Sequence, residues 1–146
     1  MQSILIVEDD LMIADMTEEF LVGSGYFVCG IARTVTAAVS LAATHLPDLA
    51  LIDLRLANGG LGTDVAAELR KIKRTGILFA SGTITQFDLT SDNGDGCLVK
   101  PYLTKDLLTS LSIVSDIVAT GSTSLPHPRG FKLLQPSNES RTALNA

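Results

Sequence analysis

Several polar residues that follow short apolar runs have side chains that could bind a metal ion and a phosphoryl group. They are a pair of carboxylates, a single carboxylate, a hydroxyl and an amine: Glu8 and Asp9, Asp53, Ser81, and Lys100. Mg²⁺ prefers oxygen ligands such as carboxylates, and ammonium and hydroxyl groups stabilise negative charge on phosphoryl oxygens. Collected in one place, these residues would bind a divalent cation together with a phosphoryl group.

Each of these residues also has a purely structural interpretation. Asp53 could start a turn or cap a helix, because Asp side chains accept hydrogen bonds from nearby backbone N–H groups. Ser81 could likewise cap a helix, and Lys100 could be a solvated surface lysine. Asp10, beside the carboxylate pair, is predicted to cap the helix that follows it rather than to bind metal. The chemical interpretation therefore depends on a fold that brings the residues together.

The apolar runs that precede these residues predict buried strands. Short runs that are apolar throughout are typical of strands covered on both faces in a parallel sheet. The runs are Ile4–Val7, Leu49–Ile52, Ile77–Ala80 and Cys97–Val99, with a further strand predicted at Tyr26–Ile31. Strands and helical segments alternate, which indicates βαβ units with right-handed crossovers. Ligands bind outside the carboxyl ends of parallel strands, so the polar residues are predicted to share one edge of the sheet.

This order of residues resembles the receiver domain of two-component response regulators, over roughly residues 3–118. That family has an acidic pair after the first strand, Asp after the third, Ser or Thr after the fourth, and Lys-Pro after the fifth. Here these positions hold Glu8-Asp9, Asp53, Ser81 and Lys100-Pro101. The resemblance implies an α/β, flavodoxin-like fold: a doubly wound five-stranded parallel sheet in the order 2-1-3-4-5, with helices on both faces.

The resemblance also implies a phosphorylation reaction and a metal site. Asp53 would attack phosphorus and form an acyl phosphate. The donor would be a phosphohistidine on a sensor histidine kinase or a histidine phosphotransfer protein. Mg²⁺, or Mn²⁺, would be bound directly by Asp9 and Asp53, through a water by Glu8, and by the backbone carbonyl of Arg55.

The remaining residues of the pattern would hold the phosphoryl group. Lys100 would pair with its oxygens as a point charge, and Ser81 would donate a hydrogen bond to it. The implied function is that of a phospho-accepting regulator that signals through contact with a downstream protein. It would have no enzymatic activity beyond self-phosphorylation from a phosphodonor and autodephosphorylation.

Two segments depart from the usual family pattern. Most receivers have Tyr or Phe three residues before the Lys, where this chain has Cys97, so the aromatic switch is missing. The sequence Phe79-Ala-Ser-Gly-Thr83 is similar to the Phe-Ala-Thr-Gly motif of a receiver subgroup from alphaproteobacteria, whose members often lack that aromatic and stand alone. The family's fourth helix falls in Gly82–Gly96, which is rich in poor helix formers. We expect this helix to be short, distorted or mobile.

The composition changes near residue 121. Residues 1–120 are predicted to form the receiver domain. Residues 121–146 are rich in Ser, Pro, Asn and Thr and lack sustained periodicity, which predicts a flexible extension. Its apolar residues Phe131, Leu133 and Leu134 could dock on a partner or on a second copy.

The overall composition limits the partners and the compartment. The chain has 146 residues and a net charge of −5, with no Lys/Arg cluster, which argues against direct binding of nucleic acid. No apolar run approaches the roughly 20 residues of a membrane span, and the N-terminus lacks the features of a secretory signal. We therefore expect a cytoplasmic protein. Cys29 and Cys97 are predicted on opposite edge strands, too far apart for a disulfide.

Two other functions use similar residues. Phosphatases of the haloacid dehalogenase class place the nucleophile in an Asp-x-Asp motif after the first strand and the acidic pair late. Here the acidic pair comes first and Asp53 has no second Asp in such a motif, so the order argues against that class. The other alternative is a phosphorylation-independent binding module on a receiver scaffold, against which the intact acidic residues and Lys100 argue.

Overall fold

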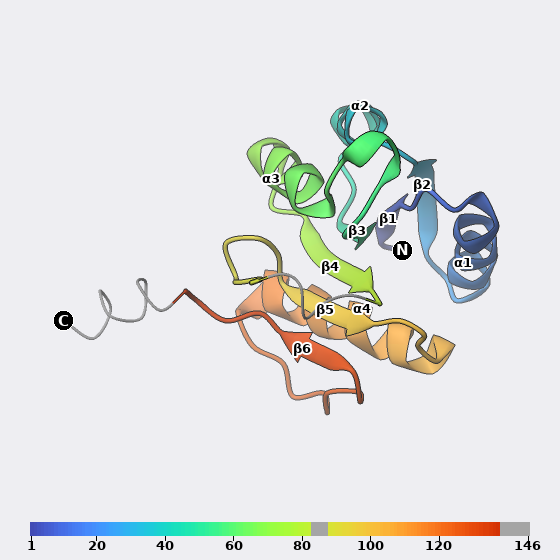
Figure 1. Ribbon diagram of the computed structural model, residues 1–146. Helices are drawn as coiled ribbons and strands as arrows, with labels where there is room; N and C mark the ends of the chain where they lie inside the picture. Colours follow the sequence, from blue (N-terminus) through green and yellow to red (C-terminus); the bar gives the residue numbers. More distant parts are fainter. Residues whose placement is uncertain (83–87, 138–146) are drawn as a thin grey trace.

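A computed structural model of the chain describes residues 1–82 and 88–137 and contains a six-stranded sheet. In chain order the strands are β1 (Ser3–Val7), β2 (Phe27–Ala32), β3 (Leu49–Asp53), β4 (Gly76–Ser81), β5 (Gly96–Val99) and β6 (Phe131–Leu133). They lie in the order β2-β1-β3-β4-β5-β6 (Figure 1). Neighbours among the first five run parallel, and β6 runs antiparallel to β5. The predicted parallel sheet and its order are confirmed for β1 to β5.

Helices cover both faces of this sheet. They are α1 (Leu11–Gly23), α2 (Val35–His45), α3 (Gly62–Ile72) and α4 (Thr104–Thr120), with a short 3₁₀ helix, η1 (Ala57–Gly59). One core layer buries residues of α1 and α4, such as Leu21 and Leu111, against the sheet. The other layer buries residues of α2 and α3, such as Ala38 and Leu69. Within the described ranges, no helix is long and apolar enough to cross a membrane.

Helix α4 packs closely on the sheet at Gly76, the first residue of β4. A Cβ atom at this position would lie 2.7 Å from Leu49 Cδ2 and 2.8 Å from Val114 Cγ1. Side chains do not approach one another so closely without displacement, so glycine allows α4 to lie directly against β3 and β4. This contact supports the strands that carry Asp53 and Ser81.

The sheet has one strand more than the five predicted, because the C-terminal segment adds β6 to the outer edge of β5. Leu134 is only 5% exposed, and Phe131 packs against the core layer formed with α1 and α4. The flexible extension predicted for residues 121–146 therefore does not hold for residues 131–134, which dock on this chain's own sheet. The unpaired backbone groups of a strand edge favour such pairing. Residues 138–146 of the extension lie outside the described residues.

The segment between β4 and β5 is described at residues 82 and 88–95, and these residues form no helix. Residues 83–87, in the middle of the segment expected to hold a short or distorted helix, lie outside the described residues, so that expectation stays a prediction. The turn before β5 is anchored by Asp95, which is buried. Its carboxylate pairs with Arg70 at 3.2 Å and with Arg74 at 2.7 Å. The turn is thereby tied to the C-terminal end of α3.

The two cysteines are both free. Cys29 lies on the edge strand β2 and is half-buried, whereas Cys97 is fully buried on β5. Because β6 covers β5, the prediction that Cys97 lies on an edge strand is wrong. Three strands still separate the two residues, so they do not pair. Burial raises the pKa of the Cys97 thiol to about 11, which makes it a poor nucleophile.

Candidate functional site

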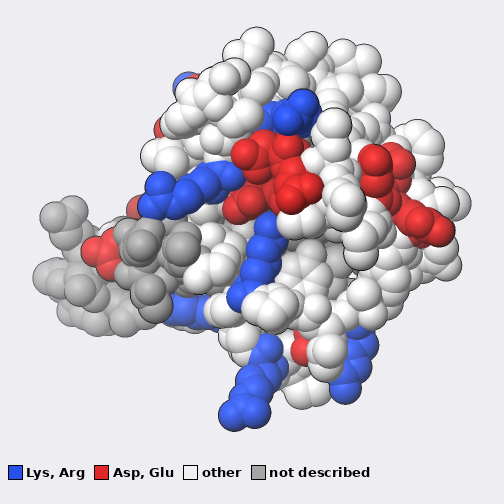
Figure 2. All heavy atoms as spheres, turned by 45° about the vertical axis from the view of Figure 1, so that its right-hand side comes forward, with Lys and Arg blue, Asp and Glu red and all other residues white. Residues whose placement is uncertain are grey.

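The predicted site residues lie at one edge of the sheet, where β1, β3, β4 and β5 end. Glu8 follows β1, Asp53 ends β3, Ser81 ends β4 and Lys100 follows β5. Glu8 and Ser81 are buried, while Asp53 and Lys100 are half-buried. Figure 2 shows a central patch of Asp and Glu side chains that Lys and Arg side chains border, and a second acidic group to its right. The prediction that these side chains share one edge of the sheet is confirmed.

Three carboxylates form the acidic part of the site. Oxygen atoms of Glu8, Asp9 and Asp53 all lie within 4.8 Å of one another. The Lys100 ammonium lies 3.4 Å from Glu8 Oε1 and 3.4 Å from Asp53 Oδ2. Three carboxylates beside one lysine leave an excess of negative charge when all are ionised, which is the electrostatic setting of a cation site.

The surroundings shift the pKa values of Glu8 and Lys100. Burial and a hydrogen bond to Asp53 raise the pKa of Glu8 to about 8, although Lys100 opposes the shift. Burial also disfavours the charged form of Lys100, but attraction by Asp53 and Glu8 outweighs it and raises the Lys100 pKa. Lys100 is therefore charged at neutral pH, whereas Glu8 without a bound ion is largely protonated.

The donor set fits a hard divalent cation. Within the part of the chain that the structure describes, Glu8 Oε2 is buried and accepts no hydrogen bond. Buried polar atoms in folded proteins nearly always have a partner, so an ion or a water is the natural partner of this oxygen. Glu8, Asp9 and Asp53 offer oxygen ligands only, which suits Mg²⁺ or Mn²⁺.

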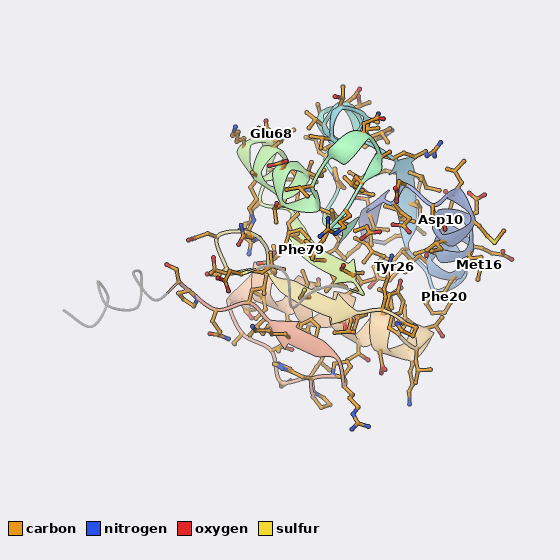
Figure 3. All side chains as sticks on the ribbon, in the orientation of Figure 1. Asp10, Met16, Phe20, Tyr26, Glu68 and Phe79 are labelled. Atoms are coloured by element: carbon orange, nitrogen blue, oxygen red, sulfur yellow. The ribbon has the colours of Figure 1, made fainter. Side chains whose placement is uncertain are left out.

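Asp10 caps helix α1 and does not belong to the acidic group. Its Oδ1 atom accepts hydrogen bonds from the backbone N–H groups of Met12, at 3.0 Å, and Ile13, at 3.3 Å. Figure 3 shows Asp10 at the start of α1. The prediction that Asp10 caps this helix is confirmed.

The loop after Asp53 is a closed clip, residues 54–62. Two backbone hydrogen bonds of 2.9 Å close it, one from Leu56 to Gly60 and one from Gly62 to Leu54. A Cβ atom at Gly62 would collide with the Asp53 carbonyl oxygen, so α3 begins directly against the end of β3. At the start of the clip, the Arg55 N–H group donates a 3.4 Å hydrogen bond to Asp53 Oδ1. The Arg55 backbone therefore lies beside the Asp53 carboxylate.

Sequence reasoning did not identify two neighbours of the site. Arg33, just after β2, donates a hydrogen bond of 3.2 Å from Nε to the Asp9 carbonyl oxygen. Tyr102 lines a small cavity together with Glu8, Asp53 and Lys100. Arg33 could have been found from its place after β2, because β2 ends at the same edge of the sheet. Tyr102 follows Lys100-Pro101, and no pattern in the sequence singles it out.

Comparisons with known proteins match the same part of the chain. The family model of the response regulator receiver domain matches residues 4–112. The phyllosphere-induced regulator PhyR of Methylorubrum extorquens is 35% identical over 102 residues, which are 68% of this chain and 38% of that protein. The transcriptional regulatory protein PdtaR of Mycobacterium tuberculosis is 32% identical over 114 residues, which are 75% of this chain and 55% of that protein.

Solved structures agree with the sequence comparisons. The crystal structure of a CheY-like response regulator receiver domain protein from Methanospirillum hungatei is 26% identical, with a TM-score of 0.73. The alignment covers 84% of this chain and 99% of that one. By contrast, the chain spans about half the length, or less, of the curated relatives it matches. The family match extends over most of the chain, from β1 into α4, and shows that it belongs to the response regulator receiver domain family, whose members act in signal transduction.

Proposed function

We propose that the chain is a phospho-accepting response regulator that receives a phosphoryl group on Asp53. The donor is a phosphohistidine on a sensor histidine kinase or a histidine phosphotransfer protein, and the output is contact with a downstream protein. The observation that supports this proposal most is the Lys100 ammonium, 3.4 Å from Asp53 Oδ2, within the carboxylate group of Glu8 and Asp9.

The transfer is a nucleophilic displacement at phosphorus. An Asp53 carboxylate oxygen attacks the phosphorus atom, the P–N bond to the donor imidazole breaks, and that nitrogen takes up a proton. The product is an acyl phosphate on Asp53. Lys100, already beside Asp53, pairs with the phosphoryl oxygens, and Ser81, at the end of the next strand, donates a hydrogen bond to them.

Asp9 and Asp53 would hold Mg²⁺ or Mn²⁺ directly, Glu8 through a water, and Arg55 through its backbone carbonyl. The ion, when bound, supplies the positive charge that lets an anionic carboxylate approach an anionic phosphoryl group. Before the ion binds, Lys100 holds the Glu8 and Asp53 carboxylates together from one side.

An apolar surface beside the site supports a protein as the phosphodonor. A cavity of about 580 Å³ lies between α1 and the start of α4, and Met16, Phe20 and Lys100 are among the residues that line it. Figure 3 labels Met16 and Phe20 on α1. The Met16 side chain is 65% exposed. Contiguous exposed apolar surface marks protein-binding sites, and this one borders the lysine of the site.

The proposal is tested by labelling with a small phosphodonor. The full chain is incubated with phosphoramidate and Mg²⁺, and its intact mass is followed. We expect a gain of one phosphoryl group that is stable in acid and labile in base, and that is absent from Asp53→Asn. Asp64→Asn, which changes an exposed Asp in the first turn of α3, is the matched control and should label normally. Labelling of Asp53→Asn at the wild-type rate would overturn the assignment of Asp53.

A further inference from the structure

The edge of β5 is covered by a short C-terminal segment, residues 130–134, which we call the β6 arm. At one end of the arm, the Val99 N–H group donates a 3.0 Å hydrogen bond to the Gly130 carbonyl oxygen. At the other end, the Leu134 N–H group donates a 3.0 Å hydrogen bond to the Asp95 carbonyl oxygen. The arm therefore occupies backbone groups that β5 would otherwise present as a free edge, a surface suited to an added strand.

The sequence of β5 is suited to this arm. A Cβ atom at Gly96 would lie 2.7 Å from Cε2 of the Phe131 ring, so a larger residue there would displace the ring. Gly130, where the arm begins, has a φ of 85°, a left-handed conformation that favours glycine. The His127 ring contacts the Phe131 ring edge-on at a centroid distance of 5.3 Å. Residues on both sides of the contact thus fit the docked arm.

The arm is held less firmly than the inner strands. Strand β6 is only 3 residues long, and residues 121–130, which connect it to α4, are mostly exposed. Leu134 and Phe131 do contact the core, but a short edge strand at the end of an exposed connection opens at a lower free energy than the inner strands of the sheet. Release of the arm therefore costs less free energy than opening of the inner strands.

The β5 end of this contact is also part of the functional site. The Lys100 N–H group donates a 3.2 Å hydrogen bond to the Ser81 carbonyl oxygen, and the preceding residue, Val99, is the one bonded to Gly130. In the order β3-β4-β5-β6, Asp53 and the arm lie on opposite sides of β5 (Figure 1). A displacement of Ser81 toward a group on Asp53 would therefore be transmitted through the Lys100 N–H group to the end of β5, where Val99 holds the arm.

We propose that the β5 edge is a strand-docking surface whose occupant is the chain's own β6 arm, and that a phosphoryl group on Asp53 releases this arm. The inference rests on the proposed function, since it requires Asp53 to be phosphorylated. A ligand shifts an equilibrium only through its different affinities for the two states. Here the docked arm holds the end of β5 against the displacement that the phosphoryl group favours, and the released arm does not.

The first test is amide hydrogen exchange of the wild-type full chain, with and without phosphoramidate and Mg²⁺, with the phosphorylated fraction read from the intact mass. We expect the Val99 and Leu134 amides to exchange between about 5-fold and 150-fold faster in the phosphorylated chain, the usual range of such couplings. The Asp48 amide, bonded to the Ser3 carbonyl oxygen away from the arm, should not change. A chain that gains the phosphoryl mass with unchanged exchange at Val99 and Leu134 overturns this inference alone. A chain that gains no mass overturns the proposed function and this inference with it.

The second test uses the reciprocity of coupled equilibria. Phe131→Ala removes the ring that docks the arm, so it should speed exchange at Val99 without any phosphodonor. It should also tighten the binding of beryllofluoride with Mg²⁺, a mimic of the phosphoryl group. The gain in affinity should be at most the factor by which exchange at Val99 becomes faster in the phosphorylated wild type. Lys132→Ala, an exposed neighbour on the same strand, is the matched control and should change neither quantity. Faster exchange in Phe131→Ala with unchanged or weaker beryllofluoride binding would contradict the proposal.

Discussion

Lys100 Nζ lies 3.4 Å from Glu8 Oε1, yet the pKa of Glu8 is raised to about 8 because burial outweighs this attraction. The pair therefore links proton binding to metal binding. A protonated Glu8 adds no negative charge beside the ion, and a bound cation favours its ionised form, so protons and Mg²⁺ compete for the site even though Glu8 would reach the ion through a water.

We predict that Mg²⁺ binding to the full chain strengthens as the pH rises from about 6 to about 8, by up to about tenfold per pH unit, because one proton is displaced. Above about pH 8, where Glu8 is already ionised, the dependence should level off. Isothermal titration calorimetry in buffers matched for ionic strength measures this. In Glu8→Gln the affinity should be lower and its slope over this range lost. A slope retained by that variant would show that another group titrates.

The neighbours Asp9 and Asp10 should respond differently to substitution. Asp9→Ala removes a carboxylate of the acidic group and should weaken Mg²⁺ binding by about tenfold or more. Asp10→Ala should leave Mg²⁺ binding nearly unchanged but lower the free energy of unfolding by about 1 kcal/mol, since the start of α1 loses its cap. Mg²⁺ titration and urea denaturation of the two variants separate these effects. Equal losses of Mg²⁺ affinity would show that both carboxylates serve the metal.

Asp95 is predicted to be a structural anchor. It is 6% exposed, pairs with two arginines and accepts a 2.8 Å hydrogen bond from the Ile77 N–H group. Asp95→Ala leaves these donors without their acceptor and should lower the free energy of unfolding by about 2 to 3 kcal/mol. Chemical denaturation measures the loss. Asp92→Ala, an exposed Asp in the same turn, should cost less than about 0.5 kcal/mol, and a similar cost for both would contradict the anchoring role.

Gly76 tests the packing of α4 on the sheet, and Gly23, at the end of α1, serves as its control. Gly76→Ala places a methyl group within 3 Å of Leu49 and Val114 and should destabilise the fold by about 1 to 3 kcal/mol through overpacking. At Gly23, the last residue of α1, a Cβ atom meets nothing within 4 Å. Gly23→Ala should therefore be neutral or slightly stabilising. Thermal unfolding followed by circular dichroism compares the two, and a Gly76→Ala variant as stable as the wild type would disprove the close contact.

Met16 should matter for a protein phosphodonor and not for a small one. Met16→Lys places a charge in the apolar cavity beside Lys100, so transfer from a sensor kinase that phosphorylates the wild type should slow by about tenfold or more. Labelling by phosphoramidate should keep its wild-type rate. Val22→Lys, which changes another exposed apolar residue of α1 outside that cavity, is the control. Equal slowing with both donors would place the effect in the site itself.

The sequence was sufficient to predict the fold around Asp53 because each strand is a continuous apolar run that ends in a polar residue. That pattern determined which strands are buried and which edge of the sheet carries Glu8, Asp53, Ser81 and Lys100. Asp10 could be assigned as a cap because the capping preference is local and does not depend on distant packing.

Strand β6 could not be predicted in the same way. Three residues are too few to show a period of two, and the strand is stabilised by an edge that lies more than 30 residues away in the sequence. Two glycines fit the docked strand, Gly96 on β5 and Gly130 just before β6. Neither predicts β6 unless Phe131 is already known to lie against β5. The contact that Arg33 makes could not be recognised from residue type or spacing, because its partner is a backbone carbonyl oxygen, a group that every residue carries.

The clip of residues 54–62 holds the main chain directly after the nucleophile at several points. Two backbone hydrogen bonds close it, Gly62 lies against the Asp53 carbonyl oxygen, and the Leu54 and Leu56 side chains are buried in the core. The Arg55 backbone, whose carbonyl would bind the ion, is therefore held in place before any ion arrives. The site is preorganised on this side, so ion binding does not have to order the loop.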